Sequence, residues 1–67
     1  MKIVFQSKSN FIVSGQINGM SDFEIKDEVI DTYERELDRR FPGGFVCNVL
    51  TDLSKAGNKF TLEITRA

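Results

Sequence analysis

The N-terminal part of the chain contains two short stretches whose side chains suit a pleated sheet. Residues 1–6 are rich in β-branched and aromatic side chains, and residues 11–18 alternate between two faces. The polar segment 7–10 between them is typical of a turn. The pattern therefore predicts a β-hairpin. Gly15, inside the second strand, indicates a bulge or the close approach of a neighbouring group.

The C-terminal part of the chain repeats this arrangement. Residues 45–53 are typical of a strand, and the polar segment 54–58 predicts a turn. Residues 59–65 alternate most regularly, with three large apolar side chains on one face: Phe60, Leu62 and Ile64. A second hairpin is expected here.

Between the two hairpins the apolar residues recur with the period of an α-helix. Ser21 and Glu24 form the sequence signature of a capping box, which marks a helix start. Pro42 and the two glycines after it end the helix at Phe41. This predicts one helix of about 20 residues, roughly 30 Å long. Its expected apolar side consists of Phe23, Val29, Ile30, Tyr33, Leu37 and Phe41.

The order of elements is therefore β-β-α-β-β. We interpret it as a single α+β domain over residues 1–67, in which one long helix packs on one face of a four-stranded sheet. Two strand orders are open: a β-grasp-like sheet, with the first and last strands central and parallel, or a split arrangement. Five side chains are expected on the helix-covered face: Phe5, Phe11, Phe45, Cys47 and Phe60.

Composition narrows the classes of function. The chain has 67 residues, nine Lys and Arg against ten Asp and Glu, no His and one Cys. Imidazole catalysis and His-ligated metal sites are therefore excluded, and one Cys can form neither an internal disulfide nor a thiolate cluster. We expect a protein that is not an enzyme and uses no metal or cofactor. With no apolar run near the ~20 residues of a membrane span, and a lone Cys, we expect a cytoplasmic location without membrane partners.

The predicted helix holds most of the charge. Its segment from Ser21 to Phe41 contains eight acidic and four basic residues, a formal charge of −4, whereas the rest of the chain is +3. Five acids recur at spacings of three and four residues, which would align them opposite the apolar side of a helix. This acidic stripe consists of Glu24, Asp27, Asp31, Glu34 and Asp38.

Two interpretations of the acidic stripe are open. It is suited to docking on a basic surface of a larger protein, such as a nucleic-acid-binding groove, because complementary charge speeds association and selects the partner. Alternatively, it is a solvated face that keeps a small protein soluble. The first interpretation predicts a protein-binding module that inhibits or modulates its target.

The sheet face away from the helix is a second candidate surface. Four aliphatic side chains are expected there among polar neighbours: Val4, Ile12, Val46 and Leu50. They favour a homodimer or a second partner contact, and so a small structural or assembly subunit as the alternative function. Scattered exposed aliphatics, which are common, are the simpler explanation. RNA-binding sheets display aromatic and basic side chains, so direct nucleic-acid binding is less favoured.

The segment from Tyr33 through Phe41-Pro42-Gly43-Gly44-Phe45 to Val49 resembles the helix-to-strand junction of small phage proteins that inhibit host RNA polymerase. The resemblance covers about a quarter of the chain and consists of a helix end followed by an alternating strand, so it identifies no family. It agrees with the acidic stripe, because some small phage inhibitors mimic the charge of DNA. It implies an inhibitor acting in a host cytoplasm.

Overall fold

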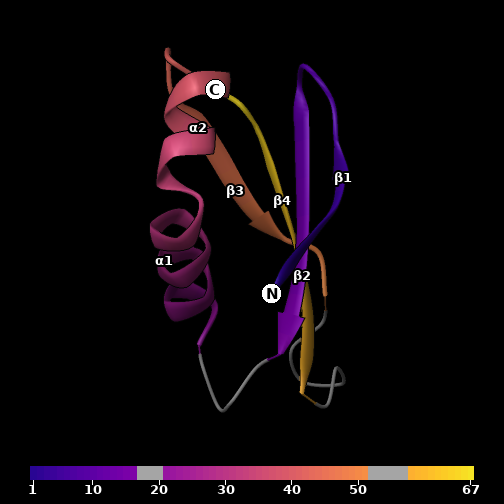
Figure 1. Cartoon of the computed structure of the whole chain (residues 1–67). Helices are drawn as coiled ribbons and strands as arrows, with labels where there is room; N and C mark the ends of the chain where they lie inside the picture. The colour runs from indigo at the N-terminus through magenta and orange to yellow at the C-terminus, as the bar shows by residue number, and fades with distance from the viewer. Residues whose placement is uncertain (17–20, 52–57) are drawn as a thin grey trace.

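In the part of the chain that the structure describes, four antiparallel strands form one sheet, and two helices cover one of its faces (Figure 1). The computed structural model describes residues 1–16, 21–51 and 58–67. The elements are β1 (Lys2–Gln6), β2 (Asn10–Gln16), α1 (Asp22–Thr32), α2 (Glu34–Arg40), β3 (Phe45–Val49) and β4 (Lys59–Arg66). The predicted strand ends at 17–18 and 52–53, and the predicted turn at 54–57, lie outside the described residues. The α+β class and the four-stranded sheet are confirmed.

The strands lie in the order β1-β2-β4-β3. A β-grasp-like arrangement is therefore wrong, because β1 lies at an edge and the β2–β4 pair in the centre is antiparallel. The last strand, β4, lies between β2 and β3, so the chain leaves β2, crosses the sheet through the helices and enters β3 on the far side of β4. The first hairpin turns at Ser7, whose backbone N–H donates to the Asn10 carbonyl at 2.8 Å and whose Oγ accepts from the Asn10 N–H at 3.1 Å.

The helical segment is divided in two, so the prediction of one long helix is wrong. α1 and α2 meet at Tyr33, whose φ of −113° and ψ of 27° depart from helical values. The buried residues of the segment 22–41 favour this division, because they follow a four-residue spacing around Tyr33: Ile25, Val29, Leu37 and Phe41. At 100° per residue, each step of four turns the apolar side by about 40° in a straight helix. The departure from helical dihedral angles at Tyr33 allows the residues before and after it to be buried against the same sheet.

The edge strand β1 contains an irregularity that changes which side chains it exposes. Ile3 pairs with Val13 and Phe5 pairs with Ile12, so two steps along β1 match one step along β2 and the register shifts at Val4. Phe5 is 51% exposed. The expectation that Phe5 faces the helix is wrong, because the register shift places it opposite Ile12, whose neighbours Phe11 and Val13 point into the core.

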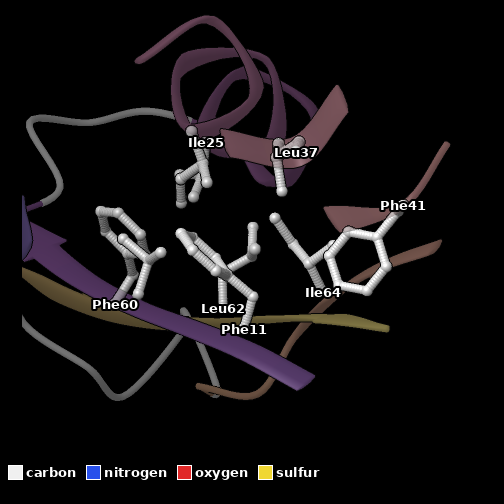
Figure 2. Close-up of a cluster of buried hydrophobic side chains, with 9 residues drawn as sticks. Phe11, Ile25, Leu37, Phe41, Phe60, Leu62 and Ile64 are labelled. Carbon is white, nitrogen blue, oxygen red and sulfur yellow. The ribbon is translucent and has the colours of Figure 1, made fainter. Parts of the chain in front are cut away.

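The core lies between the helices and the sheet. Figure 2 shows Ile25 and Leu37 reaching from the helices towards the aromatic and aliphatic side chains of β2 and β4. Among the described residues, nine hydrophobic side chains are buried: Phe11, Val13, Ile25, Val29, Leu37, Phe41, Phe60, Leu62 and Ile64. Ile30, Tyr33, Phe45 and Cys47 are partly buried against them. Phe23, expected on the apolar side, is 73% exposed, and Ile25 takes the buried position in the first turns of α1.

Candidate interaction surfaces

The five residues of the acidic stripe are all exposed, but they are divided between two helices of unlike charge. Glu24, Asp27 and Asp31 belong to α1, which has five acids and one base, a formal charge of −4. Glu34 and Asp38 belong to α2, whose three acids are matched by three arginines. The negative charge of the helical segment is therefore concentrated on α1.

Glu24 also has a structural role at the start of α1. Its carboxylate Oε1 accepts hydrogen bonds from the Ser21 N–H at 3.2 Å and the Ser21 hydroxyl at 3.0 Å, and its own N–H donates to Ser21 Oγ at 3.3 Å. This reciprocal capping box satisfies two N–H groups that the helix itself leaves without partners. The capping role accounts for the presence of Glu24 without a partner protein.

The outer surface of α1 is slightly hollowed. An open hollow of about 360 Å³ is lined by one partly buried apolar side chain and four acids: Ile30, Glu24, Asp27, Glu28 and Asp31. Glu28 was not part of the predicted stripe. It lines the hollow because it lies one helical turn after Glu24. Within the described residues the hollow encloses no group of acids placed to hold a metal ion.

In α2 the last two arginines, Arg39 and Arg40, both pair with one acid, Glu36. Glu36 accepts hydrogen bonds from Arg39 at 2.7 and 2.8 Å and from Arg40 Nε at 3.4 Å. The Arg39 hydrogen bond is the main reason that the pKa of Glu36 lies below its ordinary value. The Arg40 side chain also contacts the first hairpin, where it donates a hydrogen bond to the Ser7 carbonyl at 3.1 Å. α2 is therefore a locally neutral helix, tied to the β1–β2 turn.

The sheet face away from the helices carries two apolar strips with a polar strip between them. On the β1 side, Val4 and Phe5 are exposed and Ile12 is half-buried; on the β3 side, Val46 and Leu50 are exposed. Between the apolar strips lie polar side chains of β2 and β4, among them Asn10, Thr61, Glu63 and Thr65. The Asn10 amide donates to Glu63 Oε2 at 3.2 Å across this middle strip. The four predicted contact residues therefore form two separate groups. Val4 and Ile12 lie on the β1 side together with Phe5, and Val46 and Leu50 lie on the β3 side.

Cys47 lies on the helix-facing side of β3 and is half-buried. Burial raises the pKa of its thiol, and the positive charge of Lys26 lowers it by less. A raised pKa leaves little thiolate at neutral pH, so Cys47 lacks the activation that a nucleophile requires.

Comparison with known proteins adds no functional information. No protein-family model matches the chain, and no curated protein or solved structure is significantly similar to it. Neither α1 nor α2 has the length and the apolar composition needed to cross a bilayer. The functional argument therefore depends on the surfaces themselves.

Sequence reasoning missed two exposed aromatic side chains, Phe5 and Phe23. A signal existed for Phe23, because Ile25 continues the four-residue spacing of Val29 and Leu37 backwards, whereas Phe23 does not. For Phe5 no signal existed, because alternation along 1–6 contains nothing that marks the register shift at Val4.

Proposed function

We propose that this protein is a non-enzymatic binding module that docks the outer surface of α1 on a basic surface of a larger protein and so inhibits or modulates it. The concentration of charge on α1 is the observation that supports the proposal. Five of its eleven residues are acidic, and the acids Glu24, Asp27 and Asp31 are exposed. A nucleic-acid-binding groove would attract such a surface, as in inhibitors that phages direct at host enzymes.

The contribution of each acid should follow its surroundings. Asp27 and Asp31 are exposed on α1 and border the hollow. Glu34 and Asp38 lie on α2, whose formal charges sum to zero, and Glu24 is engaged with Ser21. Asp27 and Asp31 therefore carry the electrostatic part of the proposed contact. We place the protein in a reducing cytoplasm, where an unpaired cysteine such as Cys47 persists.

Affinity capture with two matched charge-reversal variants tests this function. The first variant is Asp27→Lys/Asp31→Lys on α1, and the second is Glu34→Lys/Asp38→Lys on α2. Both variants change the net charge by the same amount. We expect the α1 variant to lose a salt-sensitive partner that the wild type and the α2 variant retain, with circular dichroism showing that both variants remain folded. Equal retention by the α1 variant would contradict the proposal.

The second candidate function is a small assembly subunit that associates through the open sheet face. The exposure of Phe5 beside Val4 and Ile12 favours it, because these side chains make a larger apolar patch than the aliphatic residues alone. This function predicts a dimer that Ile12→Asp disrupts. Gel filtration that finds only monomer at high concentration would contradict it.

A further inference from the structure

The outer edge of β3 has backbone groups without partners in the sheet. In the described parts of the chain, β3 pairs with β4 alone. The Gly44 carbonyl accepts from the Ala67 N–H at 3.2 Å, and the Leu50 N–H donates to the Thr61 carbonyl at 2.8 Å. Because backbone groups alternate in direction along an antiparallel strand, the even-numbered residues between them bond to β4. The outer edge is therefore lined by the N–H and C=O groups of Phe45, Cys47 and Val49.

The two edges of the sheet differ in how they are protected. β1 has a lysine at its start, Lys2, and a register shift at Val4, both of which discourage another strand from pairing. β3 has five residues with neither a charge nor a proline, and its register against β4 is regular. It is thus an edge that can accept a further strand.

The side of α1 that lies beside β3 combines two apolar side chains with one lysine. α1 contacts β3, and Lys26 is close enough to Cys47 for its charge to act on the thiol. At 100° per residue, Phe23 and Ile30 lie within about 60° of Lys26 around the helix. Phe23 is 73% exposed, and Lys26 lies 3.9 Å from the Asp22 carboxylate, which balances its charge. We call Phe23, Lys26 and Ile30 the α1 flank.

We propose that the β3 edge and the α1 flank together form a homodimer interface, in which β3 pairs antiparallel with β3 of a second copy. The free backbone groups are symmetric about Cys47, so a two-fold axis there places Phe45 opposite Val49 of the second copy and forms the longest ladder. The axis also brings the two α1 flanks towards each other, which buries Phe23. No like charges meet within the strand ladder, because β3 is uncharged.

The charges of α1 are compatible with this dimer. Glu24 and Asp31 lie on the opposite side of α1 from Lys26, at about 160° and 140° around the helix. They therefore remain exposed in the dimer, whereas Asp27 lies about 40° from Phe23 and borders the α1 flank. The part of the acidic surface around Glu24 and Asp31 stays available for a partner. A domain of this size buries only about 60% of the surface that its unfolded chain exposes, less than a larger domain does, and association would add to its stability.

Substitution of exposed side chains separates this interface from the open sheet face. We expect sedimentation of the full chain to show a concentration-dependent dimer that Phe23→Glu weakens about tenfold or more, since a buried aromatic side chain can dominate the energy of an interface. Phe5→Glu is the matched control, because Phe5 is an exposed aromatic on the other edge of the sheet. It should leave the dimer intact.

Cross-linking through Cys47 tests the register. In the proposed pairing, Cys47 lies opposite Cys47 of the second copy, with about 5.5 Å between their Cα atoms. This distance is within the ~4.4–6.8 Å that a disulfide spans. Copper phenanthroline at alkaline pH should yield a covalent dimer. The control Cys47→Ser/Val46→Cys should not, because position 46 lies diagonally from its own copy at about 7–8 Å.

Three results would overturn the proposal. They are a monomer at millimolar concentration, a dimer that Phe5→Glu rather than Phe23→Glu disrupts, and cross-linking through position 46 in preference to Cys47. The second would instead support association through the open sheet face. None of them bears on the acidic surface of α1, so a failure here is distinguishable from a failure of the proposed function.

Discussion

The ring of Phe60 lies against Gly15, its partner on the neighbouring strand. A Cβ placed on Gly15 would lie 2.7 Å from Cε2 and 2.9 Å from Cζ of that ring, closer than carbon atoms approach without displacement. Phe60 is buried among core side chains, so its ring has little room to move. The glycine is therefore needed for space, in agreement with the close approach that the sequence indicated at this position.

Two glycine substitutions should change stability in opposite directions. Gly15→Ala should lower the free energy of unfolding by about 1–2 kcal/mol, because overpacking against Phe60 outweighs the reduced entropy of the unfolded chain. Gly43→Ala is the control, since nothing lies within 4 Å of its Cβ position. It should raise stability by about 0.4–1 kcal/mol. Urea denaturation of both variants measures the difference. A Gly15→Ala variant as stable as the wild type would contradict the packing argument.

Two adjacent arginines should contribute unequally. The Arg40 side chain is 25% exposed, donates to the Ser7 carbonyl and lies 5.7 Å from the centre of the Phe11 ring. The Arg39 side chain is 71% exposed and pairs with Glu36. We expect Arg40→Ala to lower the free energy of unfolding by about 1–3 kcal/mol. Arg39→Ala should change it by no more than about 0.5 kcal/mol. Equal losses in urea denaturation would contradict the role of Arg40 as the link between α2 and the first hairpin.

Glu36 should make stability depend on acid pH. Its pKa in the folded protein lies below the ordinary value of 4.5, chiefly through the hydrogen bond from Arg39. A carboxyl group whose pKa is lower in the folded state stabilises that state at pH values above its ordinary pKa. This contribution disappears as the pH falls through the pKa of the folded state. The stability difference between wild type and Glu36→Gln should thus be constant above that range and shrink below it.

Thermal unfolding across acid pH measures this dependence, with an Arg39→Ala background as the control. Removal of Arg39 takes away the main cause of the lowered pKa, so the pH-dependent part of the difference should be smaller there. An identical pH dependence in both backgrounds would show that Arg39 does not hold the Glu36 carboxylate.

Local features of the fold followed from the sequence wherever one residue type has one physical consequence. The capping box of Ser21 and Glu24 and the helix end before Pro42 lie where they were predicted, because backbone hydrogen bonding and proline geometry act within a few residues. The alternation in β4 correctly placed Phe60, Leu62 and Ile64 in the core. These predictions needed no knowledge of distant contacts.

Features that depend on how elements meet were harder to predict. The strand order depends on the path of the chain across the sheet, which alternation does not encode. The exposure of Phe5 depends on a register shift against β2, and the division of the acidic stripe depends on Tyr33. The charge on α1 could still have been recognised, because counting acids before and after Tyr33 needs only the sequence once the four-residue spacing of the core is noticed.

The junction at Tyr33 has two possible causes, and Thr32→Ala distinguishes them. The Thr32 hydroxyl donates to the Glu28 carbonyl at 2.8 Å, a bond that can bend a helix. The alternative cause is the four-residue spacing of the buried side chains on both sides. We favour the spacing, because Tyr33 still donates to the Val29 carbonyl and accepts from Leu37, and its ring packs edge-on against Phe11 at 5.5 Å.

Thr32→Ala should then raise stability by about 0.5 kcal/mol through helix propensity, while the Cα chemical shift of Tyr33 stays non-helical. Thr32→Ser, which keeps the hydroxyl, is the control. A helical shift at Tyr33 in the alanine variant alone would assign the junction to the threonine.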